Sequence, residues 1–273
     1  MSEFLSRLAR EEAVLVTVQA TRGSVPREVG AWMAVFADAT VATVGGGHLE
    51  HDAIAHARGL LARGVPASVD EPVDEPVRRY VLGPSLGQCC GGEVHLHYRR
   101  VTVRDSAALQ VQLADARVPV ALFGGGHVGR ALVRVLGALP MAVCWIDSRD
   151  EIFPTQLPDN VHCEHSDPVQ AAVAGLPAQS RVLVMSFSHA EDLDIVAACL
   201  ARQRQRGDLP YVGLIGSKTK WASFRQRLQA RGFTEAELAQ VTCPIGVAGI
   251  ADKRPEVIAV AVAAQLLQVP GAA

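Results

Sequence analysis

The most constraining feature of this sequence is a glycine-rich turn, GGGHVG at positions 124–129, which directly follows an apolar run and opens a helical pattern. Gly124 permits a tight turn, Gly126 lets the backbone approach a phosphate, and Gly129 lets the helix pack closely on the strand. The unpaired N–H groups and partial positive charge of a helix N-terminus favour an anion. The turn therefore predicts a phosphate-bearing ligand. Gly125 and His127 are expected beside it, although His127 has the alternative of only capping or packing beside the turn.

Beyond this turn, strand patterns alternate with helical patterns, which is typical of a parallel sheet. A capping box formed by Thr234 and Glu237 begins a short helix, and Pro255 occupies the first turn of the last helix. The C-terminal part is therefore predicted to be an α/β fold of the Rossmann type, with helices on both faces of the sheet. Its strands are expected at 120–123, 142–147, 161–163, 182–187 and 211–215.

The N-terminal part follows a different pattern, which predicts a smaller α+β domain. A helix is expected over 48–63, and a half-buried strand with alternating polar and apolar residues over 93–100. Residues 72–76 are expected to form a linker-like loop. Further strands are expected at 13–18, 31–36 and 42–44. The predicted organisation is an N-terminal domain over 1–103, a connecting helix within 104–118 and the Rossmann-type domain over 119–273.

Asp147 lies at the end of the second predicted parallel strand, 21 residues beyond Gly126. Rossmann folds place at this position the carboxylate that accepts a ribose hydroxyl. By itself this spacing suggests NAD as the ligand and an NAD-dependent oxidoreductase as an alternative function, and a purely structural role for Asp147 stays open. A persuasive pair of proton donors is missing for that function, although His189 with Asp194 is one combination that the sequence offers.

A second glycine run, which includes Gly46 and Gly47, lies between an apolar run and a predicted helix in the N-terminal part. The position that matches the third glycine of the fingerprint is Glu50, and no βαβ unit follows it. The run is therefore a strand-to-helix turn. Its N–H groups are either donors to a ligand or part of a purely structural turn.

Two adjacent cysteines, Cys89 and Cys90, lie in a loop with four glycines over 83–92. Such a loop leaves sulfur accessible and lets N–H groups approach it, which lowers the pKa of a thiol and favours the reactive thiolate. Zinc binding with His95 and His97 is disfavoured, because adjacent cysteines do not readily ligate one tetrahedral ion. A redox switch is an alternative, although a vicinal disulfide is strained. Cys144, Cys163 and Cys199 lie in apolar surroundings and are expected in the core.

Composition excludes several classes of protein. The 273 residues are 49% hydrophobic and 20% charged, which is typical of folded domains, and the net charge of −2 gives no reason to expect nucleic-acid binding. The start of the chain shows no secretory signal, so a cytoplasmic location is expected. The most apolar stretch, 257–267, is well short of the roughly 20 residues that cross a bilayer, so no membrane association is expected.

Several segments taken together resemble the XdhC/CoxI family, the accessory proteins of xanthine dehydrogenase and related molybdenum hydroxylases. The cysteine loop and the GSVPR loop are the specific parts of this match, whereas the glycine turn alone fits many dehydrogenases. The matching segments are GSVPREVGAWM at 23–33, GGGHLE at 45–50, LGQCCGG at 86–92, the turn at 124–129, YVGLIGSK at 211–218 and CPIG at 243–246.

The resemblance implies a chaperone or maturation factor rather than a catalyst. Proteins of the family are understood to bind the molybdenum cofactor (molybdopterin), to receive a cysteine desulfurase that replaces an oxo ligand with sulfido, and to pass the product to apo-xanthine dehydrogenase. The expected partners are therefore the molybdenum subunit of xanthine dehydrogenase and a cysteine desulfurase. A homodimer is also implied.

The resemblance also suggests roles for individual residues. The phosphate of the cofactor is expected on the turn at 124–126, and Cys89 or Cys90 at the molybdenum, since soft thiolates suit such centres. Gln88 and backbone N–H groups are expected to hydrogen-bond the pterin. Arg27 is expected either to pair with phosphate or to be an ordinary surface cation. His189 is included among the cofactor-binding candidates.

The chain departs from the family pattern at two positions. The family often has Thr-His-x-His-x-x-Asp after the fourth strand of the second domain. Here His189 and Asp194 match this motif, but Glu191 stands where the second histidine is expected. In the last helix, Gln265 stands where a glutamate is expected. The role of the site near Glu191 is therefore open.

Overall fold

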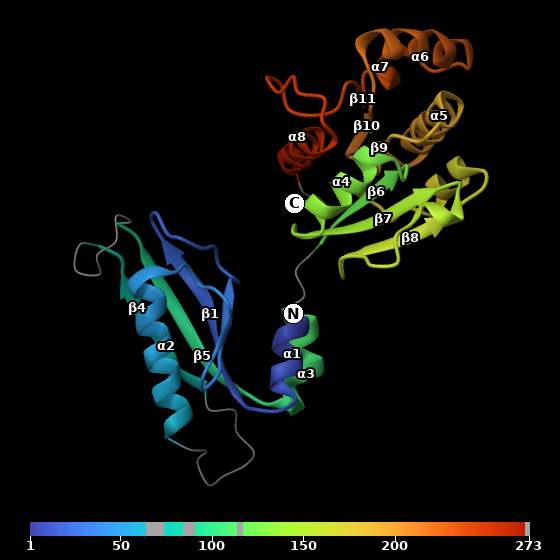
Figure 1. Ribbon diagram of the computed structural model, residues 1–273. Helices are drawn as coiled ribbons and strands as arrows, with labels where there is room; N and C mark the ends of the chain where they lie inside the picture. Colours follow the sequence, from blue (N-terminus) through green and yellow to red (C-terminus); the bar gives the residue numbers. More distant parts are fainter. Residues whose placement is uncertain (64–73, 84–90, 114–116, 271–273) are drawn as a thin grey trace. The chain divides into compact units, whose positions relative to one another are not determined.

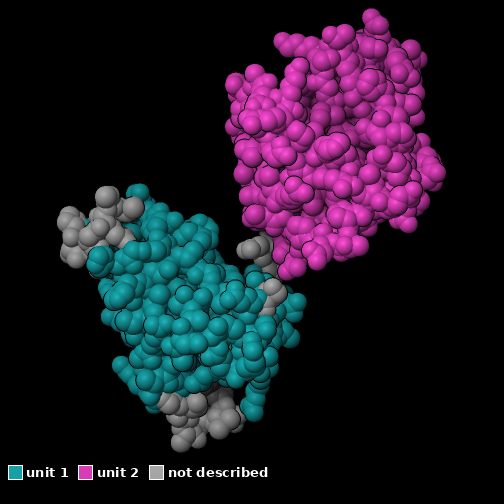
Figure 2. Space-filling view, in the orientation of Figure 1, with its two compact units in different colours: residues 1–114 teal, residues 115–273 magenta. Residues whose placement is uncertain are grey.

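The computed structural model describes residues 1–63, 74–83, 91–113 and 117–270. The chain forms two compact units, Met1–Ala114 (unit 1) and Asp115–Ala273 (unit 2), which are coloured separately in Figure 2. Each unit has its own buried apolar clusters, and each is described by itself below.

Unit 1 is an antiparallel sheet with helices on both faces (Figure 1). Helix α2 buries Leu49, Ala53 and Ala57, which are spaced four residues apart, against one face of the sheet. The short helices α1 and α3 cover the other face with Phe4 and Leu109. The strand order is β3-β2-β1-β5-β4. The elements are α1 Ser2–Leu8, β1 Ala13–Arg22, β2 Trp32–Val35, β3 Thr40–Ala42, α2 Gly47–Ala62, β4 Asp74–Val81, β5 Glu93–Val101, the 3-10 turn Val103–Asp105 and α3 Ser106–Gln112.

The structure corrects two local predictions in unit 1. The segment 72–76 was predicted to be a linker-like loop, but strand β4 begins at Asp74 and includes Pro76. A strand at the edge of a sheet tolerates proline and charge, and the pairing of β4 with β5 is irregular between Glu75 and Arg78. The strand predicted at 42–44 instead ends at Ala42, whose φ of 64° turns the chain toward the glycine run.

Unit 2 is a parallel sheet of six strands in the order β11-β10-β9-β6-β7-β8. Helices α4 and α8 pack on one face, and α5, α6 and α7 on the other (Figure 1). The chain starts in the middle at β6, builds β7 and β8 on one side, then crosses back to build β9 to β11 on the other. The bounds are β6 Val118–Phe123, α4 His127–Leu136, β7 Met141–Asp147, β8 Val161–His165, β9 Arg181–Val184, α5 His189–Arg206, β10 Tyr211–Leu214, α6 Lys218–Ala230, α7 Glu235–Leu238, β11 Val241–Thr242 and α8 Pro255–Gln268, with 3-10 segments at Asp150–Ile152 and Val169–Gly175.

This topology confirms the predicted Rossmann-type sheet with a smaller N-terminal α+β part. The order reverses between β6 and β9, and ligands of such sheets bind outside the carboxyl ends of the strands at the point of reversal. The capping box of Thr234 and Glu237 and the position of Pro255 in the first turn of α8 are also confirmed. Among the residues described, no helix has the length and apolar character needed to cross a membrane.

Candidate functional site

The glycine turn joins β6 to α4 at the point where the strand order reverses. Gly124 has a φ of +119°, and a Cβ atom on it would lie under 3.0 Å from the carbonyl of Met185 at the end of β9. A Cβ on Gly129 would lie under 3.0 Å from the carbonyl of Gly124. One on Gly125 would strike the side chain of Ile152. The packing of the protein itself therefore requires glycine at these three positions.

Gly126 is different, because the fold does not require a glycine there. Its φ of −69° suits any residue, and a Cβ atom on it would have nothing within 4 Å. Gly126 is exposed and precedes the first residue of α4, with no side chain capping the helix. The first N–H groups of a helix have no partner within the helix. The open space beside Gly126 and these N–H groups together give a phosphate room to approach.

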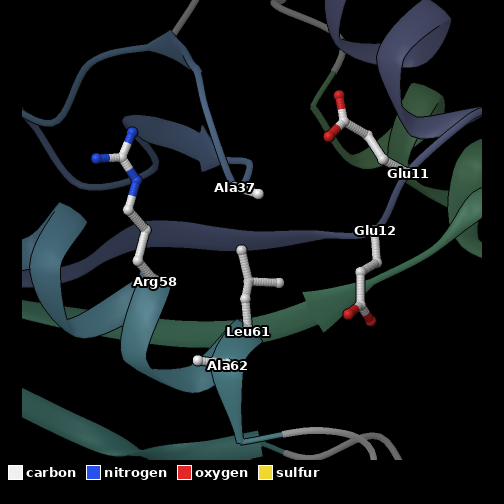
Figure 3. Close-up of a pocket in the computed structure, with 6 residues that line it drawn as sticks. All are labelled: Glu11, Glu12, Ala37, Arg58, Leu61 and Ala62. Atoms are coloured by element: carbon white, nitrogen blue, oxygen red, sulfur yellow. The ribbon is translucent and has the colours of Figure 1, made fainter.

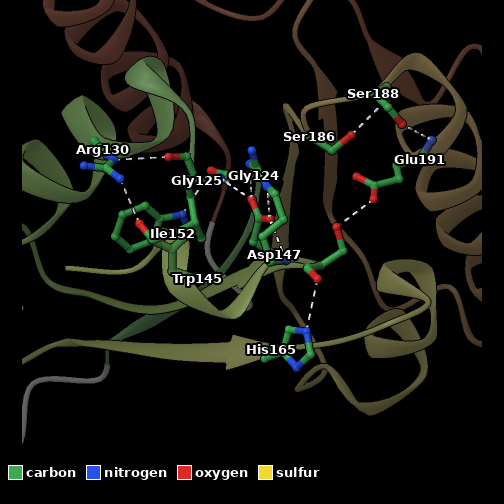
Figure 4. A network of polar contacts seen from close by, with 12 residues as sticks. Gly124, Gly125, Arg130, Trp145, Asp147, Ile152, His165, Ser186, Ser188 and Glu191 are labelled. Carbon is green, nitrogen blue, oxygen red and sulfur yellow. Dashed lines mark hydrogen bonds and ion pairs between the residues drawn. The ribbon is translucent and has the colours of Figure 1, made fainter. Parts of the chain in front are cut away.

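Side chains of β7 and α4 hold the carbonyl groups of the turn in place (Figure 4). The indole N–H of Trp145 donates to the carbonyl of Gly124 over 3.0 Å. Arg130 donates through Nε to the carbonyl of Gly125 and through Nη2 to that of Ile152. The turn is therefore held in one conformation by side chains of β7 and α4, before any ligand contributes.

Asp147 at the end of β7 is 2% exposed, and its carboxylate accepts four hydrogen bonds. Oδ2 accepts from the Gly125 N–H at 2.6 Å and from Arg149 Nη2 at 3.0 Å. Oδ1 accepts from the backbone N–H and Nε of Arg149. Burial alone would raise the pKa of Asp147, but the hydrogen bonds from Arg149 and Gly125 outweigh it and hold the pKa below its ordinary value. Binding of a ribose hydroxyl by Asp147 stays a prediction, and it requires Arg149 to move away.

Glu191 lies in the first turn of α5 and connects this helix to the end of β7 (Figure 4). Its carboxylate accepts from the Ser148 hydroxyl over 2.7 Å, and its N–H donates to the hydroxyl of Ser188, the capping residue of α5. The carbonyl of Ser148 lies 3.0 Å from His165 Nε2. Glu191 thus links α5, which follows β9, to the segment that follows β7 at the carboxyl edge of the sheet.

The structure gives His189 and Asp194 separate partners. The ring of His189 lies edge-on to Phe224, with 6.2 Å between the ring centres. Asp194 pairs with Arg231 over 2.7 Å. No hydrogen bond between His189 and Asp194 occurs among the described residues, so this conformation does not assemble them as a proton-transferring pair.

A buried ion pair that the sequence did not single out lies at the carboxyl ends of β9 and β10. Lys220 Nζ donates to Asp192 Oδ2 over 2.6 Å, and the two side chains are 12% and 2% exposed. The other oxygen of Asp192 accepts from the N–H and hydroxyl of Ser186. The pair borders an open pocket of about 440 Å³, lined by Ser186, Phe187, His189, Asp192, Ile215, Gly216, Ser217 and Lys220.

In unit 1, loops from three distant parts of the sequence meet. A Cβ on Gly45 would lie under 3.0 Å from the side chain of Pro26. A Cβ on Gly92 would lie under 3.0 Å from the carbonyl of Ser24. The GSVPR loop therefore contacts both the glycine run and the end of the cysteine loop. Gln88, Cys89 and Cys90 lie outside the described residues, so their predicted roles stay predictions.

Several hydrogen-bond donors in and beside the glycine run of unit 1 have one acceptor, the carboxylate of Glu50 in the first turn of α2. The carboxylate of Glu50 accepts from the N–H groups of Val44 and Gly46 and from the hydroxyl of Thr43. These N–H groups therefore have internal partners, which supports the structural alternative for Gly46. Gly47 is the first residue of α2.

Arg27 contacts the same loop as the glycine run. It donates to the carbonyl of Thr43 over 3.3 Å and pairs with the exposed carboxylate of Glu28 over 3.1 Å. The hydrogen bond from Arg27 lowers the pKa of Glu28. With 37% of its side chain exposed, Arg27 remains within reach of a ligand at this end of unit 1.

The four cysteines that the structure describes have poor access to the thiolate state. Burial raises the pKa of Cys144 and of Cys199 to about 12 and that of Cys243 to about 11. Burial also raises the pKa of Cys163. Within the described residues, no group of three or more histidine, cysteine or acidic side chains is arranged to hold a metal ion. His95 instead pairs with Glu93 over 2.6 Å.

A second pocket, of about 340 Å³, lies in unit 1 (Figure 3). It is bordered by Leu61 and Ala62 at the C-terminal end of α2, whereas the glycine run forms the N-terminal end of this 16-residue helix. At 1.5 Å per residue the two ends are roughly 24 Å apart. The remaining residues of its lining are Glu11, Glu12, Ala37 and Arg58, none of which belongs to the predicted site.

Comparison with known proteins gives the following relatives. Residues 120–266 match a family model described as the XdhC Rossmann domain, and residues 6–70 match one described as the XdhC and CoxI family. YqeB of Escherichia coli (strain K12) is 25% identical over 251 residues, which make up 91% of this chain but only 42% of YqeB. A crystal structure from Bacillus halodurans, described as a xanthine dehydrogenase, has a TM-score of 0.76 at 18% identity and covers 98% of this chain and 94% of that one. This structural likeness shows the fold.

The glycine turn predicts opposite outcomes for two alanine substitutions. Gly129→Ala should lower the free energy of unfolding of unit 2 by about 3 kcal/mol, because the new methyl group forces α4 away from the turn. Gly126→Ala should change it by less than about 1 kcal/mol, the size of an N-cap effect. Urea unfolding followed by circular dichroism checks both values. Equal losses for the two variants would show that Gly126 also serves packing.

The Asp147–Arg149 pair predicts a stability difference that depends on pH. Asp147→Asn should destabilise unit 2 by about 2 kcal/mol at pH 7, because hydrogen bonds to a charged acceptor are lost. The folded pKa of Asp147 lies below the value of about 3.9 in unfolded chains, so its stabilisation is complete above that pH and is lost as the pH falls through the folded pKa. The unfolding midpoints of the parent and variant should begin to converge as the pH falls below about 4, and they should meet only below the folded pKa of Asp147. A gap that persists in acid would contradict this.

Proposed function

Because the chain belongs to the XdhC and CoxI family, we propose that it is a maturation factor that binds the molybdenum cofactor and passes it to xanthine dehydrogenase. The observation that carries the proposal is the glycine turn of unit 2. Packing explains the glycines at 124, 125 and 129, whereas Gly126 borders open space at the start of α4. A phosphate group of a ligand accounts for that remaining glycine.

The residues present at the turn fit the phosphate end of this cargo. The exposed Gly126 and His127 lie at the N-terminus of α4, where unpaired N–H groups and the helix dipole favour an anion. The carbonyl groups of Gly124 and Gly125 are fixed by Trp145 and Arg130. A turn held in this way does not need to reorganise to bind, which reduces the entropic cost of association.

The metal end of the cargo is assigned to the cysteine loop of unit 1. Molybdenum in this cofactor carries soft sulfur ligands, and thiolates are suitable partners for such a centre. Cys89, or its neighbour Cys90, is the proposed contact, with Gln88 beside the pterin. The loop leads into Gly91 and Gly92, and Gly92 packs against the GSVPR loop that contains Arg27. Arg27 is the cation proposed to help hold an anionic part of the cargo.

Two further partners follow from this proposal. Sulfuration requires a donor of sulfur, for which a cysteine desulfurase is the proposed partner. Delivery requires the molybdenum subunit of xanthine dehydrogenase as acceptor. A homodimer is the proposed form of the protein. The chain spans 42% of the length of its relative YqeB.

An NAD-dependent oxidoreductase is the alternative, and the fingerprint and the strand order of unit 2 favour it. The carboxylate of Asp147 weighs against it. It already accepts four hydrogen bonds from Gly125 and Arg149, and so has no free position for a ribose hydroxyl. A nucleotide would have to displace Arg149 from a buried carboxylate.

The content of the purified protein tests the proposal. After anaerobic purification from cells that make the cofactor, the parent protein should contain molybdenum and pterin in near-stoichiometric amounts. Cys89→Ala should lose most of the molybdenum, because the proposed thiolate contact is gone. Gly126→Ala should lose both components, because a methyl group occupies the proposed phosphate position. Metal analysis and pterin fluorescence measure the two contents.

Cys163→Ala is the matched control for the cysteine, because Cys163 is partly buried on β8 and its raised pKa makes it a poor ligand. It should keep the parent content. A parent protein that is empty of pterin but retains NAD would contradict the proposal and support the oxidoreductase.

A further inference from the structure

The pocket at the ends of β9 and β10 contains a cation with unused hydrogen-bonding capacity. A lysine ammonium has three N–H donors. Within the part of the chain that the structure describes, Lys220 Nζ has two oxygen acceptors, Asp192 Oδ2 at 2.6 Å and the carbonyl of Ile215 at 2.9 Å, and it also lies 5.4 Å from the centre of the Phe224 ring. The side chain is 12% exposed and lines the pocket. One N–H therefore remains for an oxygen acceptor that enters from solvent.

The same pocket presents an exposed aromatic ring. Phe187 is 61% exposed, which is unusual for a phenylalanine next to a sheet edge lined by polar groups. The guanidinium of Arg149 lies 4.7 Å from the centre of this ring and holds it in place. A fixed aromatic ring that remains open to solvent is a suitable surface for stacking a planar ligand.

The pocket lies close to the glycine turn on the same edge of the sheet. The carbonyl of Met185, which packs against Gly124, directly precedes Ser186 in the lining of the pocket. Neighbouring strands are about 4.8 Å apart, so a point between β9 and β10 is about 7 Å from β6. A single small ligand can therefore occupy both the turn and the pocket.

We propose that this pocket binds the ring end of the ligand whose phosphate occupies the glycine turn. A planar heterocycle stacks on Phe187, and a ring carbonyl oxygen accepts the remaining N–H of Lys220. Asp192 orients Lys220 toward the ring through the 2.6 Å contact, and Ser186 holds Asp192. The assignment rests on the proposed function, for which the heterocycle is the pterin. It adds Lys220 and Phe187 as residues that select the ring.

Unphosphorylated pterin lacks the phosphate that is proposed to occupy the glycine turn. Its binding to the cofactor-free protein therefore tests the proposed ring site alone. Pterin fluorescence should report saturable binding to the parent. Phe187→Ala should weaken it by about tenfold, in line with the loss of one stacked ring. Val260→Ala, which shortens an apolar side chain of α8 that is 55% exposed, is the matched control and should bind as the parent does.

The role of Lys220 is tested by changing the ligand rather than the protein, because removing a partner of the buried Asp192 can unfold the protein. In 2,4-diaminopteridine an amino group replaces the carbonyl oxygen of pterin. The parent should bind it about tenfold more weakly than pterin, and Phe187→Ala should weaken both ligands equally. Lys220→Met, if it folds by circular dichroism, should lose the preference between them. Equal affinity of the parent for the two pteridines would overturn the role of Lys220.

The outcomes separate this assignment from the proposed function. If molybdenum and pterin purify with the parent and equally with Phe187→Ala, and free pterin binding is unchanged in that variant, the assignment is overturned while the maturation role stands. No pterin binding by the parent at millimolar concentration also overturns it. Adenosine binding that depends on Phe187, without pterin binding, would overturn it in favour of the nucleotide alternative.

Discussion

The geometry of unit 2 depends on one buried carboxylate. Asp147 ends the second strand of the sheet and accepts both the N–H of Gly125 and three donors of Arg149. The first of these bonds fixes the glycine turn against the sheet, and the others place Arg149 over Phe187. The glycine turn and the aromatic ring that lines the neighbouring pocket are therefore positioned by the same side chain. Because the Asp147 carboxylate already accepts four hydrogen bonds within the protein, it has no free position for a ribose hydroxyl of a nucleotide.

The carboxyl edge of the parallel sheet brings together groups from four βα connections. The turn after β6 offers N–H groups, the segment after β7 offers Asp147 and Ser148, and α5 contributes Glu191 and Asp192. The segment after β10 adds Lys220. These residues are linked by short polar contacts, which hold the edge in one arrangement before any ligand binds. Unit 1 separately gathers the GSVPR loop, the glycine run and the start of β5 at one place.

The sequence was sufficient to predict five of the six parallel strands, because short apolar runs between glycine and proline are typical of buried strands. It did not predict β11, since a strand of only two residues, Val241 and Thr242, forms no recognisable run. It failed for β4, whose charged residues and Pro76 are tolerated only because β4 is an edge strand. It located the glycine turn, but not which glycine is free of packing, since that depends on Met185 and Ile152. The Lys220–Asp192 pair joins residues 28 positions apart on two different helices, and only the packing of α5 beside α6 reveals it.

Transfer of the cofactor to the apoenzyme is the most direct test of a maturation role. The protein, loaded with molybdenum cofactor and freed of unbound cofactor, is mixed anaerobically with apo-xanthine dehydrogenase, a cysteine desulfurase and cysteine, and xanthine oxidation is followed. If the protein delivers the cofactor, activity should appear faster and reach a higher final level than with the same amount of free cofactor. Activity equal to that with free cofactor, or no activity at all, would contradict a role in carrying the cofactor to this enzyme.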